Sequence, residues 1–492
     1  MKFKVKDMDL ASGGPSIAIL NQKDAEKLDL HPGDRILIKH NNHQTTCVLD
    51  ISESRKAVAQ GSIGLFEEVL DKLNVKHNSI VELKFTGKPD SVRHIRDKLY
   101  GKQLNDEELY HIIDDITNDR LTQIEKTYFV SAGFINGWST DEIVGMTKAM
   151  VETGQRIKFG KVTLDKHCIG GVPNNRTTMI VIPIIAAAGF IIPKTSSRAI
   201  TSPSGTADTM ECLADVQMNE RKIKQVVKKT GACIVHGGSM NLAPADDKII
   251  EVEHPLSIDA EGQLLASVMA KKYSVSANYV LIDIPMGPEV KVKTKQEAAH
   301  LKKMFKLIGK KLGMHVNVII TDGSQPVGNG IGPLFEAEDV MSVLNNDPLA
   351  PEDLKKKSLF MAAELLSMTK HYNRRRAYKK VKEILDSGLA LKKMNEIIKA
   401  QGKRKLPAVG EHRHPCKSSK EGKVVNINNK NISKIARIAG APKDKGAGIY
   451  LNKKVGDRVK KGELLYTVYS ESKFKLGLVK ELLRTGNGYK VS

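Results

Sequence analysis

Hydrophobic and polar positions change their period along the chain, which divides it into regions of different structure. In the first region, SIAIL, DRILIKH, QTTCVLDI and SIVELKF are short apolar stretches separated by turn residues, a pattern typical of β-strands. GLFEEVLDKL, which lies between the last two, is predicted to be a helix. The pattern predicts a small α+β or barrel-like domain over residues 1–86.

Residues 87–160 have helical spacing instead. The stretches SVRHIRDKLYGKQLNDEELYHIIDDITN, TQIEKTYFVSAGFIN and STDEIVGMTKAMVETG place apolar residues three and four positions apart. Ser139 and Glu142 have the spacing of a capping box at the start of the last helix. We predict a helical domain that combines residues 87–160 with a second segment, residues 242–276.

Strand-like and helical stretches alternate from there to about residue 389. YVLIDIP and HVNVIITDG are compact apolar strands followed by turns, which is the pattern of an α/β domain, assigned here to residues 161–241 and 277–400. A basic linker, QGKRKLPAVGEHRHPCKSSKEG, separates off the rest, and the turn-rich VGDRVKKGELLYTV predicts a C-terminal α+β domain within residues 401–492. The fold class is therefore α/β multidomain.

The charge of the chain favours small anionic ligands. The formal net charge is +22, but the lysines and arginines are spread along the chain, and only 5% of residues are aromatic. Nucleic-acid binding surfaces usually combine clustered charge with aromatic stacking. We expect a basic surface that favours phosphorylated small molecules and has no specific nucleic-acid partner.

Cysteine usage and hydropathy indicate a cytoplasmic protein. The five cysteines are widely scattered without a CxxC pair, which fits reduced thiols rather than disulfides or a zinc site. MKFKVKDMDL has no apolar core, so it is not a signal peptide. MIVIPIIAAAGFII is shorter than a membrane span and contains Pro183. No membrane partner is expected.

Four stretches supply hydroxyls, glycines and cations. In KHCIGGVPNNRTT, a strand passes through a glycine turn into an apolar helix, an arrangement that points N–H groups at an anion. PKTSSRAITSPSGTADTME crowds hydroxyls around Arg198, with Thr206 and Asp208 where the next helix begins. The last two stretches carry Ser267 with Lys271, one helical turn apart, and Lys291 with Lys293 after a strand and a glycine turn.

Each stretch alone is more often a plain connection, loop or solvated face. Together they are better explained by a substrate with more than one phosphate group. The chain has no P-loop spacing and no GxSxG, HExxH or protein-kinase motif.

In order and spacing, KHCIGGVPNNRTT, SRAITSPSGTADTMECL, GGSMNLAPADDKII, PLSIDAEGQLLASVMAKK and VLIDIPMGPEVKV resemble the thymidine/pyrimidine-nucleoside phosphorylase family. Within it the chain looks most like the archaeal AMP phosphorylases, which share an extra N-terminal domain. The resemblance implies a type II nucleoside phosphorylase-like helical domain plus a large α/β domain. It also implies conversion of AMP, CMP or UMP and phosphate into a free base and ribose 1,5-bisphosphate, in AMP catabolism and nucleotide salvage. No metal or other cofactor is implied, because inorganic phosphate is the co-substrate.

The resemblance also implies roles for particular residues. Asp259 is the proton donor, and Lys271 is a possible base contact. The phosphate-binding residues are Lys166, Gly170, Thr177 and Ser196. The substrate-binding residues are Gly171, Ser197, Arg198, Ala199, Ile200, Thr201, Ser202, Thr206, Ser267 and Lys291. The family usually has serine where this chain has Cys168, which exchanges a good hydroxyl donor for a weak thiol.

Elementary chemistry is consistent with these roles. Cleavage of an N-glycosidic bond builds negative charge on the departing base, so an acid near the base nitrogen accelerates departure. His167 is more often a packed core residue at such a strand end. Asp246 and Asp247 are rival acids, although a capping role at a helix N-terminus is equally consistent with their position.

Three alternatives remain open. Extra hydroxyls in SRAITSPSG and extra lysines in GPEVKVK favour a nucleotide over a nucleoside, but a thymidine or pyrimidine-nucleoside phosphorylase is the first alternative. An anthranilate-type phosphoribosyltransferase would need an acidic magnesium site. A basic RNA-binding protein is the third. We expect the active site in a cleft between the helical and α/β domains that closes by a hinge, and a homodimer or larger homo-oligomer formed through the helical domain.

Overall fold

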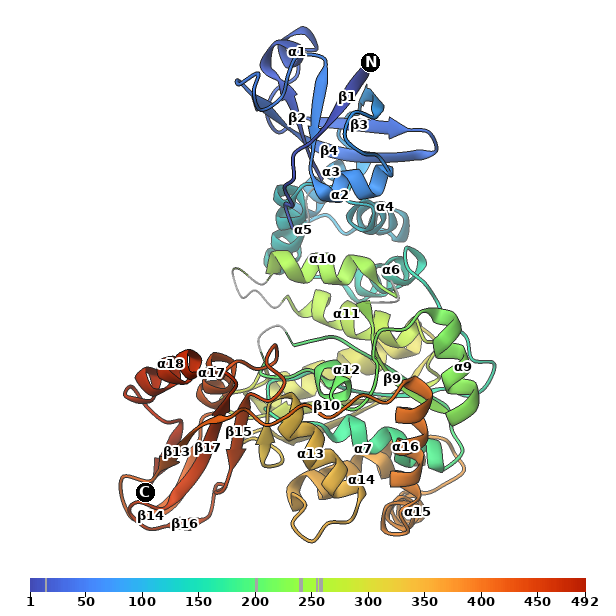
Figure 1. The fold of residues 1–492 in the computed structure, drawn as a ribbon. Coiled ribbons are helices and arrows are strands. Elements are labelled where there is room, and N and C mark those ends of the chain that lie inside the picture. Colours follow the sequence, from blue (N-terminus) through green and yellow to red (C-terminus); the bar gives the residue numbers. More distant parts are fainter. Residues whose placement is uncertain (14–15, 200–201, 239–241, 254, 256–259) are drawn as a thin grey trace. The chain divides into compact units, whose positions relative to one another are not determined.

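The fold was analysed in a computed structural model, which describes residues 1–492 except 14–15, 200–201, 239–241, 254 and 256–259 (Figure 1). The chain divides into two units. The first contains residues 1–153 and 244–266, and the second contains residues 154–243 and 267–492. The finer division into four domains stays a prediction.

A closed six-stranded barrel begins the first unit, with strand order β1-β5-β2-β4-β3-β6. Its strands are β1 (Lys2–Asp7), β2 (Ile17–Asn21), β3 (Arg35–His40), β4 (His43–Ser52), β5 (Ser62–Leu65) and β6 (Ile80–Phe85), and its helices are α1 (Gln22–Lys27) and α2 (Glu67–Leu73). Alternate residues such as Val5, Leu20, Ile38 and Leu83 fill the interior. The predicted barrel-like domain is therefore present, but sequence analysis missed β1 and β5.

Helices form the rest of the first unit. They are α3 (Asp90–Leu99), α4 (Asp106–Thr117), α5 (Gln123–Asn136), α6 (Thr140–Glu152), α10 (Pro244–Glu253) and the start of α11 (Glu261–Tyr273). The predicted capping box is present, since the Ser139 side chain accepts from the Glu142 backbone and the Glu142 side chain accepts from the Ser139 backbone. Glu142 also accepts from the buried ammonium of Lys98 at 2.7 Å and from the Leu104 N–H at 3.0 Å. One carboxylate thus ties together three segments of the bundle.

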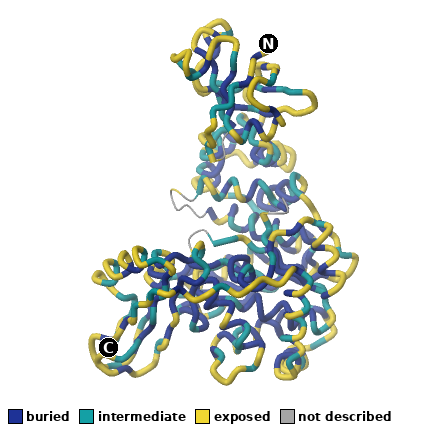
Figure 2. The backbone as a smooth tube through the Cα atoms, in the orientation of Figure 1, coloured by how far each residue is buried: buried dark blue, intermediate teal, exposed yellow. Residues whose placement is uncertain are grey.

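Parallel strands form the centre of the second unit. β7 (Leu164–Cys168), β10 (Tyr279–Met286) and β11 (His315–Asp322) pair in the order β11-β10-β7, while β8 (Ile192–Ser196) pairs with β9 (Ala232–His236). A parallel bridge between Thr163 and Ile191 links the two groups. The strands are largely buried except for β11, which lies at the edge of its sheet (Figure 2). Because β7 and β8 are parallel, their carboxyl ends lie on the same edge, where α/β proteins bind ligands.

Eight helices pack around these strands and confirm the predicted α/β architecture. They are α7 (Thr177–Ala187), α8 (Thr206–Glu211), α9 (Glu220–Thr230), α12 (Lys295–Lys311), α13 (Pro333–Leu344), α14 (Glu352–Ser367), α15 (Arg374–Asp386) and α16 (Leu389–Gln401). Among the residues described, no helix combines the length and the hydrophobicity needed to span a lipid bilayer.

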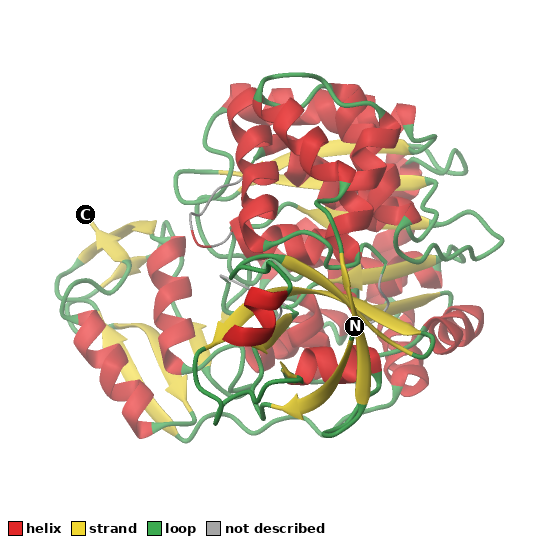
Figure 3. Ribbon diagram, turned by 90° about the horizontal axis from the view of Figure 1, so that it is seen from above, coloured by secondary structure: helices red, strands yellow, loops and turns green. Residues whose placement is uncertain are grey.

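The C-terminal region is an α+β structure, as predicted. It contains β13 (His412–Lys417), β14 (Gly422–Ile427), α17 (Asn429–Ala439), β15 (Gly448–Leu451), β16 (Arg458–Val459), β17 (Leu464–Ser470), α18 (Lys473–Leu483) and β18 (Tyr489–Val491). Figure 3 shows its helices beside its strands. The linker does not separate it completely, because β12 (Gly330–Ile331) pairs antiparallel with β15 and so adds an α/β-domain strand to its sheet.

Replacing Lys98 with methionine is expected to lower the free energy of unfolding by about 3–5 kcal/mol, because Glu142 would keep a buried charge without its cation. The matched control is Lys148→Met. Lys148 lies 3.1 Å from the exposed Asp106 carboxylate, and its loss should cost at most about 1 kcal/mol. Chemical denaturation followed by circular dichroism measures both. Equal effects of the two substitutions would contradict the role assigned to Glu142.

Candidate active site

A pocket of about 280 Å³ lies at the carboxyl ends of β7 and β8. The turn after β7, the end of β8 with its following loop, the start of α8 and Lys271 of α11 line it. The sequence-predicted residues that it brings together are Gly170, Gly171, Ser196, Ser197, Arg198, Ala199, Ser202, Thr206 and Lys271. Its lining belongs entirely to the second unit.

The two glycines of the first motif have different roles. Both have positive φ, +94° at Gly170 and +95° at Gly171, which favours glycine at each position. A Cβ on Gly170 would meet nothing within 4 Å, whereas one on Gly171 would lie 3.0 Å from the Val290 Cβ and 3.2 Å from the Lys291 backbone nitrogen. Gly171 therefore lets the segment after β10, which carries Lys291, approach the turn.

Lys166 and Thr177 are buried next to this turn and do not line the pocket. The Lys166 ammonium donates to the Thr177 hydroxyl at 2.7 Å and to the Thr178 hydroxyl at 3.2 Å. Burial lowers the pKa of Lys166. An anion bound at the turn would stabilise the charged form of this lysine.

Cys168, where the resemblance implies a serine in related proteins, is held as a thiol. Its sulfur accepts from the Asn175 side-chain amide at 3.0 Å and from the Gly170 N–H at 3.4 Å. Burial raises the pKa of the thiol to about 11. Burial also lowers the pKa of the neighbouring His167 well below its ordinary value, with further lowering by Lys272 and Lys194. Both side chains are therefore uncharged at neutral pH.

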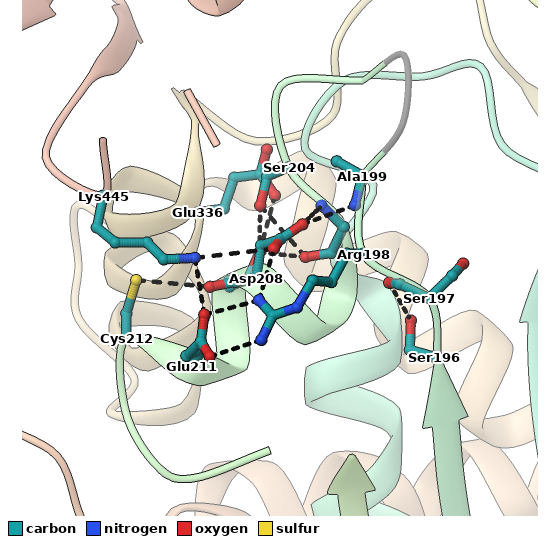
Figure 4. A network of polar contacts seen from close by, with 12 residues as sticks. Ser196, Ser197, Arg198, Ala199, Ser204, Asp208, Glu211, Cys212, Glu336 and Lys445 are labelled. Atoms are coloured by element: carbon teal, nitrogen blue, oxygen red, sulfur yellow. Dashed lines mark hydrogen bonds and ion pairs between the residues drawn. The ribbon is translucent and has the colours of Figure 1, made fainter. Parts of the chain in front are cut away.

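Arg198 is an anchor in this structure. Its guanidinium donates to both oxygens of Glu211 at 2.7 Å and to Asp208 at 3.1 Å (Figure 4). The Arg198 hydrogen bonds, together with Lys445 at 3.0 Å, lower the pKa of Glu211 to about 2. Asp208 also accepts from the Ala199 and Gly205 N–H groups at 2.7 and 3.0 Å. Two carboxylates thus fix the shape of the loop that lines the pocket.

Sequence analysis missed two cations that line the pocket. Arg176 donates to the Thr206 hydroxyl at 3.1 Å and to the Ser204 carbonyl at 2.6 Å, and its Nε pairs with Glu336. Lys194 lies 3.7 Å from the buried Asp165, which also binds Lys272 at 2.7 Å. The sequence offered only weak signals for these two residues: Arg176 precedes the apolar helix, and Lys194 precedes the hydroxyl-rich loop.

The remaining sequence-predicted residues are placed as follows. The Lys271 ammonium donates to the Ser267 hydroxyl at 3.0 Å, which confirms that they share a face of α11, although Ser267 does not line the pocket. Lys291 does not line it either. Asp246 and Asp247 lie in the first turn of α10, within the first unit. Ile200, Thr201 and Asp259 lie outside the described residues.

Sequence models of three protein domains match the chain. Residues 92–154 match a glycosyl transferase family helical bundle domain, and residues 160–391 match the a/b domain of that family. Residues 423–490 match a pyrimidine nucleoside phosphorylase C-terminal domain. AMP phosphorylase 1 from Archaeoglobus fulgidus is 43% identical over 491 residues, which cover 99% of this chain and 96% of the relative. The chain belongs to the thymidine and AMP phosphorylase family.

Other members of this family are equally similar. AMP phosphorylase from Thermococcus kodakarensis is 43% identical, covering 97% of this chain and 95% of the relative. A Legionella pneumophila protein named "Putative thymidine phosphorylase" is 43% identical, covering 92% of this chain and 87% of the relative. The family membership expected from the motifs is confirmed, and the chain is an enzyme of the pentosyl-transferring class.

A solved structure shares the fold of this phosphorylase-family chain. Anthranilate phosphoribosyltransferase from Thermus thermophilus matches with a TM-score of 0.54 at 16% identity, covering 63% of this chain and 99% of that chain. This likeness concerns the fold alone.

Gly205→Ala is expected to reduce phosphorolytic turnover by about 10²-fold through displacement of the pocket loop. The added Cβ would lie 2.8 Å from both the Ala199 nitrogen and the Ser197 carbonyl oxygen. These are backbone atoms, which can move away only if the loop itself shifts. Gly237→Ala is the matched control, because its Cβ would have only ordinary contacts, at 3.8 Å. Steady-state kinetics test this, with thermal unfolding to check that both variants fold. Parent-like turnover in Gly205→Ala would contradict the role assigned to the loop.

Proposed function

We propose that the chain is a nucleoside 5′-monophosphate phosphorylase that acts on AMP, and also on CMP and UMP, in cytoplasmic nucleotide breakdown and salvage. The observation that carries the proposal is the pocket beside the glycine turn, which hydroxyl side chains and cations line together. Relatives named AMP phosphorylase that match almost the whole chain, N-terminal barrel included, support the choice of AMP.

The proposed reaction is a displacement at the anomeric carbon. An oxygen of inorganic phosphate forms a bond to C1′ while the C1′–N bond to the base breaks, and the bonding pair leaves with the base. The base nitrogen takes up a proton, so the products are a free base and ribose 1,5-bisphosphate. Holding phosphate close to C1′ in a fixed polar environment is the main requirement, which needs no metal or other cofactor.

Phosphate is assigned to the glycine turn. Lys166, Gly170, Thr177, Ser196 and Thr206 would hold it, with Lys166 acting from behind the turn. A buried lysine whose pKa is lowered by burial favours a nearby anion, which supports this assignment. Arg176, which donates to the Thr206 hydroxyl, would keep that hydroxyl in position.

The nucleotide is assigned to the adjacent surface. Ser197, Ala199, Ile200, Thr201 and Ser202 would hold the sugar and its ester, with Gly171 allowing Lys291 to reach the 5′-phosphate. The close approach of the Lys291 backbone to the Gly171 turn supports this part. Because Asp208 and Glu211 already hold the Arg198 guanidinium, we assign Arg198 a positioning role in this loop.

The base is assigned to the Ser267–Lys271 face of α11, with Asp259 as proton donor. The hydrogen bond between Lys271 and Ser267 supports their action as a pair. Closure of the helical domain over the α/β domain would exclude water and so prevent hydrolysis. We also propose that the enzyme works as a homodimer or larger homo-oligomer formed through the helical domain.

A thymidine or pyrimidine-nucleoside phosphorylase is the second candidate. The Legionella pneumophila relative favours it, because it is as similar to this chain as the AMP phosphorylases are. The two candidates differ in whether the substrate carries a 5′-phosphate, and also in the base and sugar that the enzyme accepts.

Substrate comparison separates these candidates. We expect kcat/KM for AMP to exceed that for adenosine, uridine and thymidine by about 10²-fold or more, because polar groups built for a phosphate would be left unpaired. Base release is followed chromatographically in phosphate buffer, with CMP and UMP run in parallel. Equal rates for AMP and adenosine would contradict the nucleotide proposal. Salt-dependent RNA retention without base release would favour the RNA-binding alternative.

Asp259→Asn is expected to lower kcat by about 10²–10⁴-fold with little change in KM, because the amide cannot donate the proton to the departing base. The comparison is Asp247→Asn, which changes an exposed carboxylate in the first turn of α10 and should have parent-like kcat. A pH–rate profile is recorded for each variant. Near-parent activity in Asp259→Asn would remove Asp259 from the acid role.

A further inference from the structure

A second pocket, also of about 280 Å³, lies in the first unit where barrel residues meet bundle residues. It shares no lining residue with the candidate active site. Barrel residues Cys47 and Val48, together with Leu121 from the segment before α5, give it apolar walls. Charged side chains complete the lining, and their pairing indicates what the pocket can bind.

Lys126 is a buried cation that lacks a partner. It lies in α5, lines the pocket and is only 6% exposed. Across the part of the chain that the structure describes, its ammonium makes neither a hydrogen bond nor an ion pair. Burial lowers the pKa of Lys126. A lysine that is largely buried and has no hydrogen-bonded acid is unlike an ordinary surface lysine.

The other cations around the pocket are already paired. Asp119 binds Lys72 at 2.9 Å and Lys248 at 2.5 Å, so one carboxylate serves two lysines. Arg35 pairs with Glu125. Glu251 also lines the pocket, and its charge, with that of Asp119, favours the charged form of Lys126, although neither carboxylate accepts a hydrogen bond from its ammonium in the described structure. Lys126 is therefore the lining cation that has a donor to offer to a ligand.

Glu68 is the complementary feature on the barrel side. One of its carboxylate oxygens accepts from the Gly13 N–H at 2.7 Å. The other, Oε2, is buried and has no hydrogen-bond partner in the described structure. The pocket is thus lined by a cation without a hydrogen-bonded partner, Lys126, and by a buried acceptor without one, Glu68 Oε2.

We propose that this pocket binds a small phosphate monoester that also carries hydroxyl or amino donors, the chemistry shared by phosphorylated sugars and nucleotides. The phosphate lies against Lys126 with Lys72 and Lys248 beside it, where lysine ammonium groups act as point charges. A hydroxyl or amino group of the ligand donates to Glu68 Oε2, and the apolar walls contact the sugar or base. The ligand joins the barrel to the bundle, so its binding stabilises the first unit.

Calorimetric titration of the full-length chain with ribose 5-phosphate, AMP, inorganic phosphate and ribose tests this proposal. Binding at this pocket is the part of the parent's binding signal that is lost in Lys126→Met. We expect Lys126→Met to weaken this binding by about 10-fold or more, since it removes a charged hydrogen bond. Lys84→Met, which changes an exposed barrel lysine outside the pocket, should bind like the parent. If the binding that is lost in Lys126→Met is tighter for AMP than for ribose 5-phosphate, the ligand is a nucleotide. If it is tighter for ribose 5-phosphate, the ligand is a sugar phosphate.

Two further measurements exclude a trivial loss of fold. Because Lys126→Met removes an unpaired buried charge, its thermal midpoint without ligand should equal or exceed that of the parent. Glu68→Gln should weaken ribose 5-phosphate more than inorganic phosphate, because the sugar hydroxyls reach Oε2 while the phosphate group lies against Lys126. Identical isotherms for the parent and Lys126→Met would overturn the proposal, whatever the catalytic activity of the chain. The proposal would also be overturned if the binding that is lost in Lys126→Met were as tight for ribose as for ribose 5-phosphate.

Discussion

An imbalance of buried charge beside the β7 strand is the constraint on which the candidate active site depends. Lys194 and Lys272 share the carboxylate of Asp165, and Lys357 lies 3.5 Å from Asp283, while Lys166 contacts only hydroxyl groups. Four lysines therefore face two buried aspartates. Because burying uncompensated charge is costly, burial lowers the pKa of Lys166 and brings the pKa of Lys272 to about 7, and an anion nearby would favour their charged forms. A phosphate at the glycine turn would supply the missing charge.

In the pocket loop, by contrast, acidic side chains balance the charges of the cations. Asp208 and Glu211 take up the charge of Arg198 and Lys445, and Asp208 also binds two backbone N–H groups. These contacts leave the loop with a fixed shape and no net demand for an anion. The pocket thus has a loop whose charges are balanced on one side and lysines at and behind β7 and β8 on the other, and under the proposed function this division of charge would place phosphate on the β7 side.

Local patterns predicted much of this arrangement. The capping box at Ser139, the glycine turn and the shared face of Ser267 and Lys271 follow from residues close together in the sequence. β1 was missed although KFKVKD alternates polar and apolar residues, because only Phe3 and Val5 are apolar, and β5 was missed because it has only four residues. The Asp165–Lys272 pair joins residues far apart in the chain, and no local pattern encodes such a partner. Arg198 lies close to Asp208 and Glu211 in the sequence, but their contact depends on the path of the loop between them, which the residue pattern does not show.

Strand β12 has a consequence for how this family can change its domain content. It belongs to the α/β domain but pairs with β15 of the C-terminal sheet. In the other direction, Lys445 of the C-terminal region forms an ion pair with Glu211 on the pocket loop. A shortened chain that ended near residue 410 would leave β12 without its strand partner and the Glu211 carboxylate short of one cation. The last region is thus not an exchangeable appendage. It can be lost or replaced only together with compensating changes beside the substrate loop.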